Sequence, residues 1–254
     1  MPFGAIERLT RADAPTLAFE NTPGEGPTRV WLSGFRSDLT GTKATALAER
    51  AARDGVAFVR FDYSGCGQSD GAFEDGTISR WLDDTLAILD AVTTGPLLLI
   101  GSSMGGWLAL LAALERAERV KGLVLIAPAP DFTERLMWPD LPAEGRAAIE
   151  RDGVWNRPSA YGDGPYPITR ALIEDGRANL VLDGPIAFAG PVHILHGQAD
   201  ADVPWGLSLE LAERLDSEEV RMTFVKNGDH RLSGPADLAL IAETVDAMAR
   251  RVVG

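Results

Sequence analysis

The sequence predicts an α/β fold in which helices cover both faces of a mostly parallel central sheet. Short aliphatic and β-branched runs alternate with segments of helical periodicity, a pattern typical of parallel sheets. The run Leu-Leu-Leu-Ile at 97–100 is apolar throughout, as expected of a strand buried on both faces. The 254 residues contain no internal repeats and no linker-like segments, so a single domain over residues 1–254 is expected.

The alternation runs along the chain in a regular order. Strands are expected near residues 16–20, 28–32, 57–62, 97–102, 121–127, 192–196 and 221–225. Helices are expected near residues 42–53, 77–92, 104–117, 207–215 and 235–252. The helix at 77–92 and the helix at 235–252 each align their apolar side chains along one stripe. The last helix also has Pro235 in its first turn, where a missing N–H is tolerated. We expect both stripes to face the core.

The stretch at about 131–190 interrupts this order. It holds helical fragments, a Pro- and Gly-rich run at 161–167 and the aromatic residues Trp138, Trp155 and Tyr166. Insertions of this length are uncommon unless they are functional, so we expect a helical lid over an active site. Its apolar side chains, which include Leu136 and Met137, are expected to line a substrate trough; the alternative is that the aromatic residues only pack the lid onto the core.

Composition argues against several classes of partner. A formal net charge of −13 disfavours nucleic acid and anionic membranes, because phosphate binding needs clustered Lys and Arg. No apolar run approaches the roughly 18 residues of a membrane span, and residues 1–10 lack signal or transit character, so a cytoplasmic location is expected. The single cysteine, Cys66, leaves no internal disulfide and lies among glycines rather than at a helix start, which disfavours a nucleophilic role.

The motif G-x-S-x-G, which holds a nucleophilic serine on a sharp turn between a strand and a helix, occurs twice. The match centred on Ser103 follows the buried strand and precedes an apolar helix. The match centred on Ser69 lies in a Gly- and Asp-rich loop with no helix after it. A helix N-terminus favours developing negative charge, so Ser103 is the predicted nucleophile and Ser69 a turn residue. Ser102 has glycines at neither two-residue offset.

A serine hydroxyl becomes a good nucleophile only when a histidine accepts its proton. With this elbow, the chain order of the catalytic residues is serine, acid, histidine, each on a loop after a strand. His193 and His196 lie on the penultimate strand, ahead of the candidate acids. His230 follows the last expected strand and is therefore the predicted general base.

The imidazole needs a carboxylate to fix its tautomer. Asp200 and Asp202 both follow the strand that holds His196. Residues 196–204 resemble the pattern H-G-x-x-D-x-x-V-P found in enzymes with this elbow, and the register of that resemblance selects Asp200. Asp202 is then expected to be a solvated loop carboxylate or a helix cap. Asp229 is adjacent to His230 in sequence, where its side chain is badly placed to bond the same ring, and is expected to be solvated.

The tetrahedral intermediate of such a reaction needs two backbone N–H donors. One is expected from Met104, the residue after the nucleophile, and the other from Phe35, in the loop after the strand at 28–32. The alternative for Phe35 is an ordinary glycine turn. No cofactor is expected and no metal, since His193 and His196, three apart on a strand, point to opposite faces.

With these residues placed, the chain resembles the α/β-hydrolase domain-containing palmitoyl-protein thioesterases, a group that includes acyl-glucuronide esterases. The resemblance spans most of the chain and rests on G-T-K-A at 41–44, R-F-D-Y-S-G-C-G-Q-S-D-G at 60–71, G-S-S-M-G-G-W at 101–107, G-V-W at 153–155, P-S at 158–159, V-P-W at 203–205 and D-H-R at 229–231.

The resemblance implies the α/β-hydrolase fold and hydrolysis of S-acyl cysteine thioesters and acyl-glucuronide esters. Ser103, Asp200 and His230 match the family triad. The partner implied is a small-molecule or S-acylated protein substrate. Two alternatives stay open: a general short-chain carboxylesterase, and a non-catalytic binding protein on the same fold.

Overall fold

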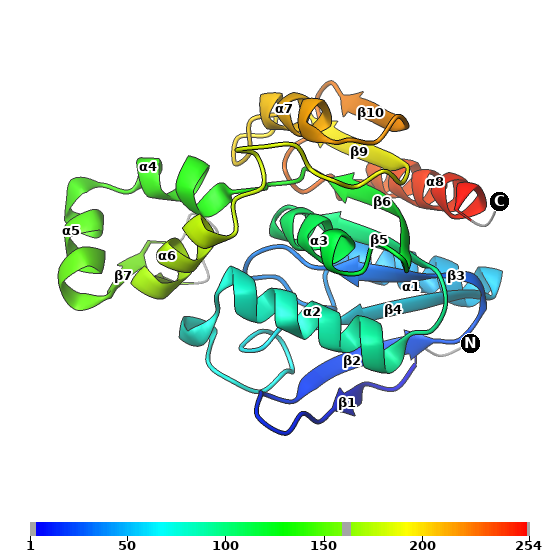
Figure 1. Cartoon of the computed structure of the whole chain (residues 1–254), viewed down its shortest axis with the longest axis horizontal. Helices are drawn as coiled ribbons and strands as arrows, with labels where there is room; N and C mark the ends of the chain where they lie inside the picture. Colours follow the sequence, from blue (N-terminus) through cyan, green and yellow to red (C-terminus); the bar gives the residue numbers. More distant parts are fainter. Residues whose placement is uncertain (1–3, 159–163, 253–254) are drawn as a thin grey trace.

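An eight-stranded sheet forms the centre of the molecule, which is a computed structural model that describes residues 4–158 and 164–252 (Figure 1). The strand order is β1-β2-β4-β3-β5-β6-β9-β10. The strands are β1 (Glu7–Leu9), β2 (Leu17–Thr22), β3 (Glu25–Leu32), β4 (Val56–Phe61), β5 (Leu97–Ser102), β6 (Val120–Ile126), β9 (Val192–Gly197) and β10 (Val220–Val225). Only the β1–β2 and β2–β4 pairs are antiparallel, which confirms the predicted mostly parallel sheet.

Five helices flank the sheet near their predicted positions: α1 (Thr42–Asp54), α2 (Ile78–Val92), α3 (Met104–Glu115), α7 (Gly206–Arg214) and α8 (Pro235–Arg251). The alternation of side chains along each strand divides the core into two layers. On β5, Leu97 and Leu99 pack in the layer that holds α2 and α3, while Leu98 and Ile100 pack with α1 and α8. All six residues of β5 are buried, as its uniform apolar sequence predicted.

Three strands were not predicted. β1 is three residues long and mostly exposed, and its sequence carries no alternation of apolar and polar residues. β7 (Val154–Arg157) and β8 (Tyr166–Thr169) form a separate antiparallel pair within the insertion. The Pro- and Gly-rich run expected at 161–167 falls partly outside the described residues, which resume at Gly164.

The insertion contains a π-helical turn, η2 (Thr133–Met137), and the helices α4 (Trp138–Asp140), α5 (Ala143–Asp152) and α6 (Arg170–Ala178), together with β7 and β8. Figure 1 shows α4, α5, α6 and β7 grouped beside the sheet, at one end of the molecule. None of the helices in the described part of the chain combines the length and apolarity that a bilayer crossing requires.

A buried carboxylate joins the two ends of this insertion. Asp131 is fully buried, and its two oxygens accept the backbone N–H groups of Val181 and Leu182, each at 2.9 Å. Asp131 adopts a positive φ of 58°, which is uncommon for a residue other than glycine but tolerated by aspartate. The start and the end of the insertion are therefore held together at the edge of the domain.

Candidate active site

Ser103 occupies the turn between β5 and α3, in a strained backbone conformation with φ 55° and ψ −119°. Two close approaches explain why glycines flank it. A Cβ atom on Gly101 would lie 2.2 Å from the backbone oxygen of Gly105, and a Cβ on Gly105 would lie 2.1 Å from that of Leu32. Real side chains do not tolerate such contacts, so the motif is required by the turn itself.

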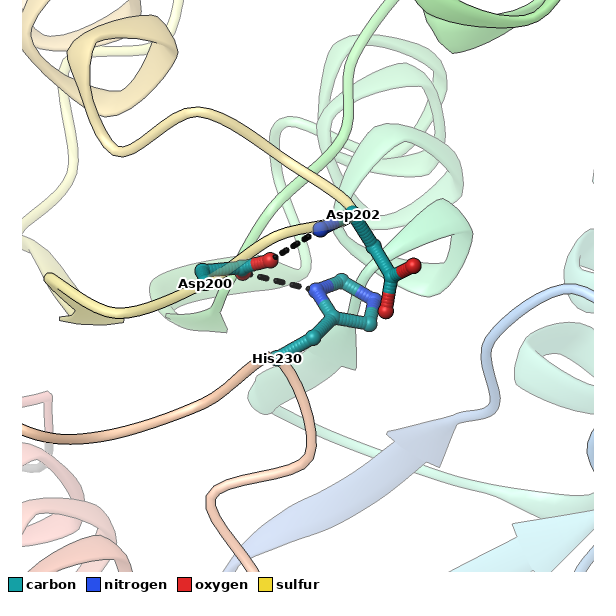
Figure 2. A group of neighbouring side chains, drawn as sticks. All are labelled: Asp200, Asp202 and His230. Carbon is teal, nitrogen blue, oxygen red and sulfur yellow. Dashed lines mark hydrogen bonds and ion pairs between the residues drawn. The ribbon is translucent and has the colours of Figure 1, made fainter. Parts of the chain in front are cut away.

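His230 and Asp200 form a continuous chain of hydrogen bonds with Ser103. The Nε2 atom of His230 lies 3.1 Å from Ser103 Oγ. Its Nδ1 atom lies 2.8 Å from Asp200 Oδ2, and Figure 2 shows this contact between the ring and the carboxylate. Because a carboxylate only accepts, Nδ1 carries the proton and Nε2 is free to accept the serine hydroxyl proton. The structure thus brings together the three residues selected from sequence as nucleophile, base and acid.

The loop carrying His230 lies directly against the end of β9. A Cβ on Gly197 would come within 2.2 Å of the backbone oxygen of Gly228, so only glycine allows the two segments to approach this closely. Asp229 is exposed, and its Oδ1 accepts the N–H groups of Arg231 and Leu232 at 3.1 and 2.9 Å. Asp229 therefore shapes the turn that presents His230 and does not bond the ring.

Asp200 has no exposed side-chain surface. Burial alone favours its neutral form, but N–H donors from His196, His230 and Val203 outweigh that effect and hold the pKa of its carboxyl well below the usual range. Asp200 Oδ1 accepts the backbone N–H groups of Asp202 and Val203 at 2.9 and 2.8 Å. The carboxylate is therefore charged and fixed in orientation.

Phe35 and Met104, the predicted oxyanion donors, line the same cavity as Ser103. Met104 is the first residue of α3, where backbone N–H groups lack intrahelical partners. A Cβ on Gly34 would lie 3.4 Å from Ser103 Cβ, so the loop leading to Phe35 passes beside the nucleophile. The ring of Phe35 packs in an aromatic cluster, 5.6 Å from the ring of Phe132. The role of the two N–H groups stays a prediction.

Ser103 and His230 open into a cavity of about 1090 Å³ between the sheet edge and the insertion. Its apolar lining includes Phe35, Met104, Ala129, Phe132, Leu136, Met137, Pro139, Tyr166, Val203 and Pro204. Leu136, Met137 and Tyr166 were expected here from sequence. Phe132 was not, because it lies at the start of the insertion, where no periodicity distinguishes it from loop.

Trp138 and Trp155 are not among the residues that line this cavity, contrary to the trough predicted from sequence. Trp138 lines a separate cavity of about 270 Å³ between α5 and α6, with the guanidinium of Arg177 5.0 Å from its ring centre. Trp155 packs so tightly on α5 that a Cβ on Gly145 would lie 3.0 Å from its indole. Both indoles therefore pack against other elements of the insertion, whereas the alternative expected from the sequence was packing of the lid onto the core.

The competing nucleophiles are placed for structural roles. Ser69 donates its hydroxyl to the backbone oxygen of Asp62 at 2.7 Å and accepts the N–H of Ala18 at 2.9 Å, so it closes a turn. Cys66 is buried. Burial first, and then the charges of Asp62 and Asp84, raise the pKa of its thiol to about 12, which leaves negligible thiolate at neutral pH.

One group of side chains at the site has the composition of a metal site. Single ligand atoms of Asp200, Asp202 and His230 lie within 4.8 Å of one another (Figure 2). Both oxygens of Asp200 already accept hydrogen bonds, and the Nδ1 atom of His230 is bound to one of them. A metal would have to break the hydrogen bonds that lead to Ser103, so we assign Asp200 and His230 to proton transfer and not to a metal site. His193 is engaged elsewhere, with Thr223 Oγ1 at 2.9 Å.

Comparison with known proteins supports the fold and the chemistry. The family model Hydrolase_4, described as serine aminopeptidase, S33, matches residues 32–149. Palmitoyl-protein thioesterase ABHD10, mitochondrial, is 40% identical in Bos taurus and 39% in Homo sapiens, over 95% of this chain and 79% of each relative. A hydrolase from Agrobacterium vitis S4 has 46% identity and a TM-score of 0.92, covering 98% of this chain and all of that one. Mouse ABHD10 has 39% identity and a TM-score of 0.90, with the same coverage.

These relatives correct one prediction. Their names place them in mitochondria, so the cytoplasmic location expected from composition is wrong. Location is specified by targeting signals that are read separately from the catalytic fold, and the composition of a catalytic domain cannot supply it. The predicted α/β-hydrolase fold is confirmed by the same comparison.

Proposed function

The chain belongs to the ABHD10 palmitoyl-protein thioesterase family of α/β-hydrolases and hydrolyses carboxylic esters or thioesters; from that premise we propose that its preferred substrates are fatty-acyl thioesters. The observation that carries the proposal is the cavity of about 1090 Å³ whose apolar wall reaches Ser103. An acyl chain offers no polar group to recognise, so its selection depends on buried apolar area, at about 0.8 kcal/mol for each methylene.

In the proposed reaction, Ser103 Oγ attacks the thioester carbonyl carbon while His230 Nε2 takes the hydroxyl proton. Asp200 stabilises the imidazolium that forms. The N–H groups of Phe35 and Met104 bind the oxyanion of the tetrahedral intermediate. Collapse of the intermediate breaks the C–S bond, the thiol leaves with the proton from His230, and the acyl group remains on Ser103. Water, activated by His230, then releases the fatty acid.

Activity on matched thioesters should rise as the acyl chain grows from two to roughly eight carbons. Each methylene that enters the apolar wall should raise kcat/KM by up to about fourfold, mostly through KM, because burial acts on binding. The measurement is kcat/KM across a series of straight-chain acyl thioesters that share one leaving group. A profile that favours acetyl over octanoyl would contradict the fatty-acyl assignment and leave the serine chemistry intact.

The wall can be tested with one side chain. Leu136 is half-buried and lines the cavity, so Leu136→Gln should flatten the rise with chain length while the acetyl rate changes little. Leu114, which is exposed on α3, offers a matched control, and Leu114→Gln should keep the wild-type profile. If Leu136→Gln and Leu114→Gln show the same dependence on acyl-chain length, the apolar wall does not select the acyl chain.

A second candidate, hydrolysis of acyl-glucuronide esters, is favoured by the charge of the same cavity. Five cationic residues line it, against three carboxylates, although the chain as a whole carries a net charge of −13. They are Arg36, Lys43, Arg135, Arg157 and Arg231. Arg157 pairs with Asp140 and Arg135 with Glu210. Arg36 lies over the ring of Tyr166, 4.3 Å from its centre, and makes no ion pair within the described part of the chain.

We expect Arg36 to bind the carboxylate of a glucuronate leaving group. Arg36→Gln should raise KM for an acyl glucuronide about tenfold or more, as the loss of a charge-assisted hydrogen bond does, and leave KM for the matched neutral acyl glucoside unchanged. Arg250→Gln, on the exposed side of α8, serves as the control. Equal changes with the charged and the neutral ester would reject the assignment.

A further inference from the structure

A second histidine is bonded to the proposed catalytic acid. His196, the penultimate residue of β9, has no exposed surface, and its Nε2 atom lies 3.1 Å from Asp200 Oδ2. The same oxygen receives Nδ1 of His230 at 2.8 Å. The sequence does not indicate this contact, because His196 precedes the acid along the chain and the loop after β9 must fold back to bring the two side chains together.

The tautomer of His196 follows from its partners. Its Nε2 atom faces two acceptors, Asp200 Oδ2 and the backbone oxygen of Val203, each at 3.1 Å, so Nε2 carries the proton. Its Nδ1 atom lies 2.7 Å from the hydroxyl of Ser208, which is fully buried on α7. The Ser208 hydroxyl therefore donates to Nδ1. Both ring nitrogens are satisfied by a neutral imidazole in one orientation, as burial requires.

We propose that His196 is a positioning residue for Asp200, held in its tautomer by Ser208. The inference rests on the proposed role of Asp200 as the acid of the triad. Asp200 Oδ1 is fixed by two backbone N–H groups, and among the residues that the structure describes Oδ2 would otherwise be held by His230 alone. His230 changes its protonation during each catalytic cycle, whereas the His196 N–H stays in place. The carboxylate therefore keeps its orientation at every step.

His196 also limits how strongly Asp200 attracts the proton of His230. A donor on Oδ2 withdraws part of the negative charge that stabilises the imidazolium, so its loss should stabilise the imidazolium further. Other charged groups surround His230: Asp202 beside the ring, Asp229 and Arg231 in the same loop, and Lys43 of α1, which donates to the backbone oxygen of Arg231. These groups are unchanged in a His196 variant, so a shift of the pH profile can be assigned to the lost N–H donor.

The test compares His196→Leu with His196→Gln in the full chain, using a small activated ester as substrate. Leucine fills the space without an N–H, and we expect kcat to fall about 10- to 100-fold with KM little changed, as for the loss of a hydrogen bond to a charged group. The acidic limb of the pH profile should move to higher pH. Glutamine can place its amide N–H near the position of Nε2 and should restore most of kcat and the wild-type limb.

His193 provides the matched control, because it lies on the same strand and bonds Thr223 away from the site. His193→Leu should keep wild-type kcat and pH profile. Wild-type kinetics in His196→Leu would overturn the proposal, and so would equal losses in the leucine and glutamine variants with an unmoved acidic limb, since that result indicates packing alone.

If His196→Leu fails to fold, Ser208→Ala decides the matter. It removes only the hydroxyl that fixes the tautomer, so we expect a smaller loss of kcat and a limb shifted in the same direction. A Ser208→Ala protein with unchanged kcat and pH profile would overturn the proposal. Asp200→Asn, measured beside these variants, separates a failure of this inference from a failure of the triad assignment, because it alone tests the acid.

Discussion

Replacing Ser103 with alanine should lower turnover by about six orders of magnitude, the loss typical of a removed serine nucleophile. The Oγ atom is the only group of this residue that can form the acyl intermediate, and it lies 3.1 Å from His230 Nε2. The variant should also lose all labelling by a fluorophosphonate probe, which reacts with activated serines. Labelling followed by mass spectrometry of the modified peptide measures the effect directly.

The second G-x-S-x-G match supplies the control. Ser69→Ala removes a hydroxyl that joins Asp62 to Ala18, so it should lower stability while labelling persists. Cys66→Ala should label as the wild type does, since its buried thiol has a raised pKa and takes no part. Persistent labelling of the Ser103→Ala protein, or its loss in Ser69→Ala protein that is still folded, would contradict the elbow assignment.

The main sheet was predictable because its strands are buried on both faces. β5 is apolar at nearly every position, and its bounds, Leu97–Ser102, agree with those expected from sequence. Glycine turns then fix where the strands end, so Ser103 follows β5 and Asp200 follows β9. Once these ends are known, the parallel arrangement places their loops at one edge, and His230 joins them from the loop after β10.

The insertion was less predictable because its contacts are local and its periodicity is weak. β7 and β8 are four residues each, and no alternation of apolar and polar residues marks them as a strand pair. Composition shows that Trp138 and Trp155 are large and apolar, but not which neighbours they pack against. Arg177 and Gly145 decide that, and both lie on other elements of the insertion. The bond between His196 and Asp200 was missed for a related reason: it depends on how the loop after β9 folds back.

Converting Asp200 to asparagine should cost about four orders of magnitude in kcat, the loss typical of an orienting acid. An amide NH₂ beside His230 cannot accept the Nδ1 proton, so the ring would turn to the tautomer that places its proton on Nε2, toward Ser103. Asp202→Asn and Asp229→Asn should stay within about tenfold of wild type, because exposed loop charges contribute little. Asp229→Asn keeps an oxygen that can still accept the N–H groups of Arg231 and Leu232.

The pH dependence sharpens this test. Because the N–H donors of His196, His230 and Val203 hold the pKa of Asp200 below its usual range despite burial, its charge persists over the whole range in which the wild type is active. The acidic fall of kcat/KM in the wild type therefore does not come from Asp200. In Asp200→Asn protein the negative charge is gone, the imidazolium is less stable, and the acidic limb should move to lower pH as activity falls. The opposite result would be a large loss of kcat in Asp202→Asn with Asp200→Asn near wild type. The acid would then lie two residues further along the loop, and the hydrogen bond of 2.8 Å between Asp200 and His230 would have no catalytic role.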